Sequence, residues 1–190
     1  MVKQEVLAAL DAVRGRYISG QELAAQLGVS RTAVWKAVAA LRRDGIPIKA
    51  VTNRGYTLAQ SVDVLNAAAV AAQLDEATVK ALQIEVVDRL PGTNAALRSR
   101  ADAGAQEGLV LIAQAQSAGR GRGGHSFYSP PGGLYMSILL RPEIGARQAV
   151  GLTAMAAVAA ARAAERLCGV PITIKWVNDL WKNGKKVCGI

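Results

Sequence analysis

The stretch "SGQELAAQLGVSRTAVWKAVAALRRDG", residues 19–45, predicts two short helices joined by a glycine-containing turn. Ser19 is a predicted cap of the first helix, with Glu22 three residues later, and Gly28 ends that helix. Ser30 caps the second helix, which turns Val34, Val38 and Leu41 inward. Two helices in this arrangement form a helix-turn-helix, whose second helix normally lies in the major groove of DNA.

The segments on either side extend this unit. Residues 2–13 carry apolar positions at helical spacing, and "IPIKAVTNRGYTL", residues 46–58, alternates around a turn as a two-stranded wing does. We therefore expect a winged helix-turn-helix domain over residues 1–61, which holds nine Lys and Arg against four Asp and Glu. The predicted DNA-binding residues are Arg31, Thr32, Trp35, Lys36, Arg42 and Arg54. The alternative is a structural or dimerising segment whose charges are only solvated.

Composition limits the class of protein. Of the 190 residues 51% are hydrophobic, which is enough for a buried core, and the formal net charge of +9 favours polyanionic partners. The two cysteines lack metal-site spacing and predict a reducing, cytoplasmic setting. Charges interrupt the N-terminus and the alanine-rich run near residue 160, so neither predicts a signal peptide or a membrane span.

Residues 62–190 predict a second domain of mixed strands and helices. An apolar-periodic helix is expected from Val64 onward. Strand patterns cover "LQIEVVDRL", "GLVLIAQAQ" and "LYMSILLRP"; a long helix covers "RQAVGLTAMAAVAAARAAERL"; and a hairpin covers "ITIKWVNDLW" with "GKKVCGI". Because strands and helices do not alternate strictly, the predicted fold class is α+β with a mixed, largely antiparallel sheet.

The loop "SAGRGRGGHSFYSPPGG", residues 117–133, suits an anion. Its glycines permit backbone conformations that a Cβ would forbid, and Arg120 and Arg122 offer planar donors for carboxylate or phosphate. The pattern is neither a P-loop nor a dinucleotide-binding turn. Taken alone, it is equally compatible with a mobile surface loop or a nucleic-acid contact.

Three short motifs follow the helix-turn-helix in order: "GTN" at 92–94, "AQSAGRGRGG" at 115–124 and "IKWVNDL" at 174–180. With them the chain resembles the biotin protein ligases of the bifunctional, repressor-bearing type. The resemblance implies a catalytic domain of the biotin/lipoate ligase type and biotin–[acetyl-CoA-carboxylase] ligase activity. Its substrates would be biotin and ATP with Mg²⁺. The acceptor would be the biotin carboxyl carrier domain of a biotin-dependent carboxylase.

The resemblance also implies roles for individual residues. Lys175 would touch the biotin carboxylate and the α-phosphate, and Arg120 and Arg122 would hold biotin and the adenylate as the other catalytic cations. The remaining biotin-binding residues would be Gly92, Thr93, Asn94, Gln116 and Gly121, with Gly119, Gly123 and Gly124 as the phosphate loop. Asp179 would help to place magnesium or ATP, and Trp176 would pack against the pocket wall. From local pattern alone, Thr93 or Asn94 is predicted as a helix cap.

The chain departs from the family pattern in several places. Gly92 stands where the family has Ser, Val177 stands where it has Pro, and Gly123, Gly124 and His125 replace common basic residues. We expect weaker adenylate binding as a result. The sequence ends at Ile190 without the family's remaining strands and small β-barrel, so a fragment is expected.

The leading functional prediction is a biotin ligase that is also a biotin-responsive transcriptional repressor. Biotinyl-5'-AMP would promote a homodimer on operator DNA, and no membrane is involved. One alternative is a DNA-binding, biotin-sensing repressor without full ligase activity. A lipoate-type ligase is disfavoured by the Gly-Arg-Gly-Arg loop.

Overall fold

The computed structural model describes residues 2–60 and 62–190, and the side chains of Arg122, Ala146, Arg147 and Val150 lie outside the described part. Two compact units divide the chain. The first unit comprises Met1–Gly119 and Tyr128–Leu139, and the second comprises Arg120–Phe127 and Leu140–Ile190. A separate domain over 1–61, followed by another over 62–190, stays a prediction.

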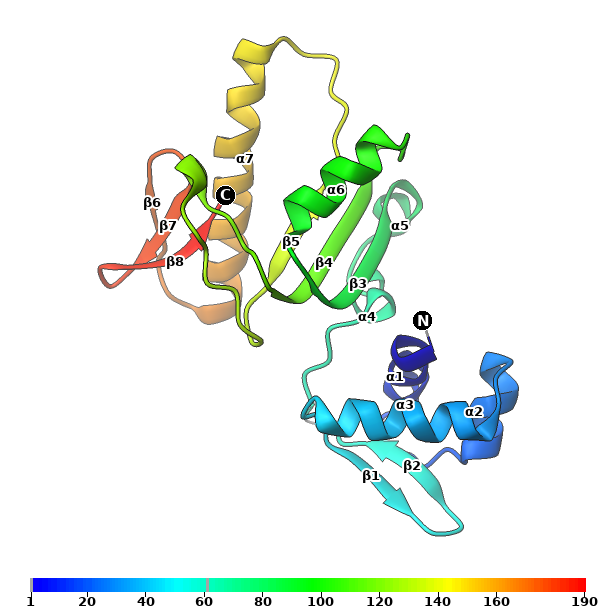
Figure 1. Ribbon diagram of the computed structural model, residues 1–190. Coiled ribbons are helices and arrows are strands. Elements are labelled where there is room, and N and C mark those ends of the chain that lie inside the picture. The colour runs from blue at the N-terminus through cyan, green and yellow to red at the C-terminus, as the bar shows by residue number, and fades with distance from the viewer. Residues whose placement is uncertain (1, 61) are drawn as a thin grey trace. The chain divides into compact units, whose positions relative to one another are not determined.

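The elements of the first unit begin with three helices and a hairpin (Figure 1). They are α1 (Val2–Ala12), α2 (Gly20–Leu27), α3 (Arg31–Arg43), β1 (Ile48–Val51), β2 (Gly55–Leu58), α4 (Ala67–Ala71), α5 (Glu76–Ala81), β3 (Gln83–Leu90), α6 (Thr93–Asp102), β4 (Leu109–Gln116) and β5 (Tyr135–Ile138). The helix-turn-helix and its wing are thus confirmed in the predicted order.

Caps define the helix-turn-helix. The Glu22 N–H donates to Ser19 Oγ, and the Ser19 N–H donates to the Glu22 carboxylate, which completes a capping box. The backbone hydrogen bond from Ser19 holds the pKa of the exposed Glu22 carboxyl below its usual value. Gly28 ends α2 in the left-handed conformation, and Ser30 caps α3. These local signals fix the turn between α2 and α3.

The wing approaches the segment between α1 and α2 very closely. Tyr56 on β2 and Ile18 exchange two backbone hydrogen bonds, of 2.8 and 2.9 Å. A Cβ on Gly55, whose φ is +96°, would stand 2.2 Å from the Ile18 carbonyl oxygen. Only glycine fits here, so Gly55 permits the wing to pair with Ile18.

Apolar side chains of α1, α2, α3 and the wing form one core. Its buried members are Val6, Leu7, Ala9, Leu10, Leu23, Ala24, Val34, Ala37, Val38, Leu41, Ile48, Leu58 and Val64. The inward stripe predicted for residues 34, 38 and 41 is therefore confirmed. Packing of these faces supplies most of the stability that short helices lack on their own.

The segment after the wing is not one helix. The apolar-periodic helix predicted from Val64 is wrong, because two short helices, α4 and α5, replace it. Asn66 Oδ1 accepts from the Ala69 N–H and Asp75 Oδ1 accepts from the Thr78 N–H, so each short helix has its own N-terminal cap. A side chain that caps a new helix at residue 75 competes with continuation of the first.

Strand β4 is the centre of a three-stranded sheet in the first unit. It pairs in parallel with β3 and antiparallel with β5. Helix α6 packs on this sheet through Leu97, which contacts Leu109 and Leu111 in a buried cluster. The predicted apolar run of β4 is buried from Leu109 to Ala113.

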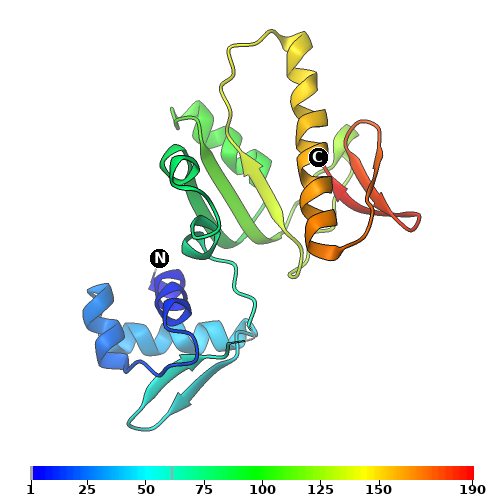
Figure 2. The ribbon, with the colours of Figure 1, turned by 180° about the vertical axis from the view of Figure 1, so that it is seen from behind.

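The second unit combines a long helix with an antiparallel sheet (Figure 2). Its elements are the short 3₁₀ helix η1 (Arg122–Gly124), α7 (Ala146–Cys168), β6 (Thr173–Lys175), β7 (Asp179–Lys182) and β8 (Lys185–Gly189). Ala157 and Ala161 of α7 pack on Leu180, and small residues let the helix lie close to the sheet. Of the five strand pairings in the described residues, only β3 with β4 is parallel, so the predicted α+β class with mixed, largely antiparallel pairing is confirmed. The strands form three separate sheets, of which only β3–β4–β5 is mixed.

None of the helices in the described part of the chain combines the length and apolar character required to cross a membrane.

We expect the N-terminal core to depend on Leu10, which is fully buried. Leu10→Ala should destabilise it by about 2–5 kcal/mol, because the lost side chain leaves a cavity. Hydrogen exchange of the α3 amides, followed by mass spectrometry, would report the loss. The matched control is Leu167→Ala, because Leu167 is 86% exposed. Equal protection of α3 in both variants would contradict this account of the core.

Candidate functional site

The first unit places a cluster of neutral polar side chains around the end of β4. Gln116 is the last residue of β4, and its Oε1 accepts from the Thr93 N–H at 2.8 Å and lies 3.3 Å from Thr93 Oγ1. Its Nε2 donates to Ser129 Oγ at 2.9 Å. Because a backbone N–H can only donate, the amide orientation of Gln116 is fixed by these contacts.

The cluster continues onto β5. Ser137 Oγ lies 2.6 Å from Asn94 Oδ1 and 2.9 Å from Thr93 Oγ1. Thr93, Ser129 and Ser137 are buried, whereas Asn94 is exposed. Among the described residues, Asn94 Nδ2 has no hydrogen-bond partner. The cluster therefore offers an uncharged donor to a ligand.

The predicted capping role of Thr93 and Asn94 is wrong. The N-cap of α6 is Gly92, which has no side chain to cap with, and both following side chains join the polar cluster instead. A Cβ on Gly92 would stand 3.8 Å from the Ala118 oxygen and 3.9 Å from Gln116 Oε1, which are ordinary contact distances. The φ of −172° is open to any residue, so Ser would fit at this position.

The glycine-arginine loop has a defined backbone in the second unit. The Gly121 N–H donates to the His125 oxygen at 2.8 Å, and a bridge joins Arg120 to Ser126. Gly123 and Gly124 have φ values of 68° and 80°, so the predicted need for glycine holds at these two positions. Gly119 and Gly121 are not in the left-handed region.

Arg120 and Arg122 are the two predicted cations of this loop. Arg120 is exposed and makes no ion pair with any residue in the described part of the chain. The side chain of Arg122, the other predicted cation, lies outside the described part. Arg120 is thus open to an anionic ligand.

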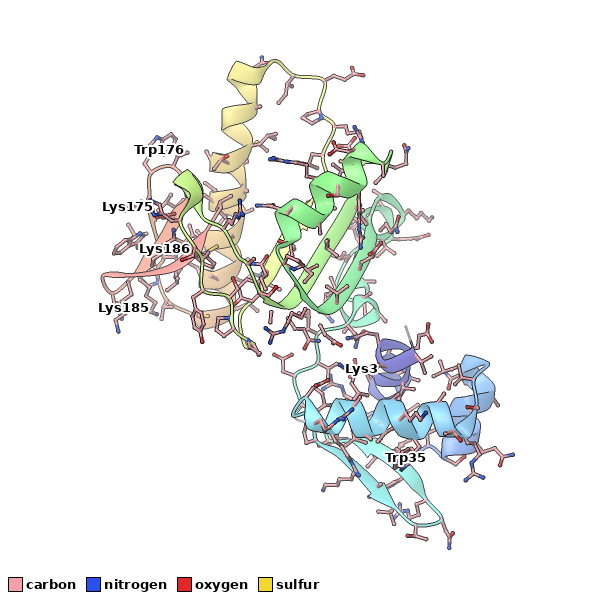
Figure 3. All side chains as sticks on the ribbon, viewed as in Figure 1. Lys3, Trp35, Lys175, Trp176, Lys185 and Lys186 are labelled. Carbon is pink, nitrogen blue, oxygen red and sulfur yellow. The ribbon has the colours of Figure 1, made fainter. Side chains whose placement is uncertain are left out.

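One face of the β6–β7–β8 sheet carries a second group of charges. Lys175 ends β6, and its Nζ lies 4.9 Å from the centre of the Trp181 ring. A cation over an aromatic face is stabilised by the ring quadrupole. Asp179 forms an ion pair with Lys186 at 2.8 Å and accepts from Asn178 Nδ2 at 2.9 Å. Figure 3 shows Lys175 and Lys186 on this sheet.

Sequence reasoning missed Trp181 and Lys186. It expected Trp176 to pack against a pocket wall, but that ring is 82% exposed. Strand periodicity contained the signal, because alternate residues of β7 and β8 share a face, and the register brings Trp181 beside Lys186. The opposite face of the sheet contacts α7, and burial there raises the pKa of the Cys188 thiol.

The predicted part of Asp179 in placing magnesium or ATP stays a prediction. Its Oδ1 already meets an ammonium group and an amide N–H. No group of three or more His, Cys, Asp or Glu in residues 2–60 and 62–190 could hold a metal ion.

A groove of about 870 Å³ lies between α3 and the wing. Arg31, Thr32 and Trp35 line it from α3, and Trp35 is 61% exposed. The position of this groove, between a cationic helix and the wing, suits contact with double-stranded DNA. The structure thus brings together three of the six predicted DNA-binding residues.

The other three predicted DNA-binding residues differ in their surroundings. Lys36 is exposed on α3. Arg42 Nε donates to the Ile48 oxygen at 2.8 Å and thereby joins α3 to β1. The Arg54 guanidinium lies 4.2 Å from the centre of the Tyr17 ring. Arg42 has this structural contact in addition to the predicted DNA-binding role.

Comparison with known proteins gives two family matches. The family described as "Biotin/lipoate A/B protein ligase family" matches residues 86–190, and "HTH domain" matches residues 3–57. A "Bifunctional ligase/repressor BirA" of Bacillus subtilis is 35% identical over 190 residues, which are 100% of this chain and 58% of that protein. The Escherichia coli protein of the same name is 34% identical over 93% of this chain and 53% of its own length.

The chain thus spans a little over half the length of the curated relatives it matches. A solved structure titled "Biotin protein ligase from Aquifex aeolicus in complex with biotin and ATP" is 30% identical, with a TM-score of 0.49. It covers 56% of this chain and 44% of that one.

We expect Gln116 to hold the start of α6 on the sheet. Gln116→Leu leaves the Thr93 N–H and the buried Ser129 hydroxyl without this partner, which should cost about 1–3 kcal/mol. Hydrogen exchange at the Thr93 amide would detect local opening. Gln106→Leu is the control, since Gln106 Nε2 donates to the oxygen of Gly104 in the neighbouring loop. An unchanged exchange rate in Gln116→Leu would contradict the role given to its amide.

Proposed function

This chain belongs to the biotin/lipoate A/B protein ligase family, and on that premise we propose that it serves biotin ligation and DNA-bound repression. Biotin is activated by ATP as biotinyl-5'-AMP and is then transferred to a lysine of a biotin carboxyl carrier domain. The observation that carries the proposal is Lys175, a cation in the family's Lys-Trp-x-Asn-Asp motif. It lies over Trp181 and makes no ion pair with any residue in the described part.

The proposed reaction has two displacements. A biotin carboxylate oxygen attacks the α-phosphorus of ATP, and the bond to pyrophosphate breaks. The acceptor lysine amine then attacks the acyl carbon, AMP leaves with the phosphate oxygen, and the amine loses a proton. Both steps shift negative charge on phosphate oxygens, so preorganised cations are the main catalytic requirement.

Roles for the residues follow from their charge. Lys175 binds the biotin carboxylate and then the α-phosphate, and Arg120 and Arg122 hold the adenylate. The phosphate-loop glycines Gly119, Gly121, Gly123 and Gly124 bring backbone N–H groups to the same anion. Magnesium would come with ATP as the counter-ion of its phosphates, and Asp179 is the residue predicted to help to place it.

The neutral polar cluster favours biotin over lipoate. We assign Gly92, Thr93, Asn94 and Gln116 to the uncharged ureido ring, which can both donate and accept hydrogen bonds. The dithiolane ring of lipoate has no comparable polar groups. A site built from hydrogen-bonding side chains rejects a ligand that leaves them unpaired. The cluster therefore supports the biotin branch of the family.

Repression is assigned to the winged helix-turn-helix. The groove between α3 and the wing binds operator DNA, and biotinyl-5'-AMP promotes a homodimer that occupies two half-sites. The proposal includes a cytoplasmic location, where both cysteines would stay as the free thiols seen here.

The second candidate function is a biotin-sensing repressor without full ligase activity. Biotin-dependent pyrophosphate exchange separates it from the first candidate.

Biotin-dependent exchange of labelled pyrophosphate into ATP tests the ligase. We expect exchange with biotin and none with lipoate. Lys175→Met should lower the rate at least about 100-fold, because a cation at the developing charge is lost. Lys185→Met removes an exposed charge from the same sheet and should leave the rate unchanged. DNA binding without any exchange would instead favour the sensor.

Salt dependence tests the DNA-binding face. Lys36→Ala should weaken binding to any duplex and reduce the slope of log K against log salt by about 0.9, because one phosphate contact is lost. Fluorescence anisotropy of a labelled duplex measures both quantities. Lys80→Ala removes an exposed lysine of α5, which pairs with Glu76, and serves as the control. Identical slopes in the two variants would remove Lys36 from the interface.

A further inference from the structure

Lys175 has an aspartate directly opposite on the neighbouring strand. The antiparallel register of β6 and β7 pairs Lys175 with Asp179. Opposite charges at such a cross-strand pair attract one another and ordinarily form an ion pair. If no other group bound Asp179, its carboxylate would form an ion pair with the Lys175 ammonium, which is the proposed catalytic cation.

The structure shows a different pairing. Asp179 Oδ1 lies 2.8 Å from Lys186 Nζ on β8, and Asn178 Nδ2 donates to the same oxygen at 2.9 Å. The Lys175 Nζ lies over the Trp181 ring instead. The carboxylate is thus neutralised by a lysine two strands away from Lys175.

The Lys186 side chain lies close to Gly189 and to the ring of Phe127. A Cβ on Gly189 would stand 3.1 Å from Lys186 Cε and Nζ, and 3.8 Å from Asp179 Oδ1. Glycine therefore leaves the room in which the ion pair lies. Lys186 Nζ is also 5.9 Å from the centre of the Phe127 ring, at the end of the glycine-arginine loop segment 120–127.

We propose that Lys186 is a positioning residue, which holds the Asp179 carboxylate away from Lys175 and so keeps the Lys175 ammonium available to the anionic group of the substrate. The consequence for substrate rests on the proposed ligase function, whereas the competition for Asp179 does not. Without Lys186, Asp179 would pair with Lys175 or repel the bound anion, and either effect weakens binding.

The first measurement needs no ligand. The full chain is treated with limiting acetyl N-hydroxysuccinimide ester, and mass spectrometry gives the rate at which Lys175 is acetylated. Lys186→Met should slow this reaction about threefold, the size expected of one new exposed ion pair. Adding Asp179→Asn to that variant should restore the rate. Lys185→Met is the matched control and should not change it.

The second measurement is the affinity for biotinyl-5'-AMP, by calorimetry. Lys186→Met should weaken it about threefold to tenfold, and the double variant with Asp179→Asn should recover it. Lys186→Arg keeps the charge and should bind as the unchanged chain does. If Lys186 instead touched the ligand itself, Lys186→Met would leave the acetylation rate of Lys175 unchanged and Asp179→Asn would not restore the affinity, and the inference would be overturned.

The two measurements separate this inference from the proposed function. A slowed and rescued acetylation of Lys175, in a chain that binds no biotinyl-5'-AMP, would sink the ligase proposal and support the pairing of Asp179 with Lys186. Normal binding of biotinyl-5'-AMP with equal Lys175 reactivity in all variants would sink the inference alone. Circular dichroism of each variant checks that the fold is intact.

Discussion

The burial of β4 is the constraint on which the first unit's site depends. Residues Leu109–Ala113 are buried and are hydrogen-bonded to strands on both sides, so the strand cannot slip without exposing its apolar side chains. Its register therefore fixes Gln116 at the strand end. From there, the Gln116 amide orders Thr93 and Ser129, and Thr93 lies beside Ser137 on β5. Apolar packing thus sets the geometry of an uncharged polar site.

The neutral polar side chains and the cationic side chains of the proposed site differ in their burial and in their hydrogen-bond partners. The neutral cluster consists of short side chains, mostly buried and tied by hydrogen bonds. Lys175 and Arg120 are exposed cations, and Asp179 is held by Lys186. This division suits the proposed adenylation, because a neutral ring needs fixed donors whereas a developing phosphate charge needs cations that are not already paired.

Local pattern was sufficient for the helix-turn-helix but failed elsewhere. Ser19, Glu22, Gly28 and Ser30 act within one or two helical turns, so their effect can be read from neighbouring residues. The single helix predicted from Val64 does not form, because Asp75 caps a new helix, α5, which interrupts the apolar-periodic segment. Thr93 failed as a predicted cap because its partner, Gln116, is 23 residues away in the chain.

The sequence by itself determined the fold class, the winged helix-turn-helix, the need for glycine at positions 123 and 124, and the motif that contains Lys175, since these depend on local spacing and residue type. Only the tertiary structure decided which partner each polar group takes. Thr93 bonds Gln116 and not its own helix, and Asp179 pairs with Lys186 and not with the lysine opposite it. Such choices depend on distances between strands that meet only after folding, because charge and hydrogen-bond energies fall steeply with separation.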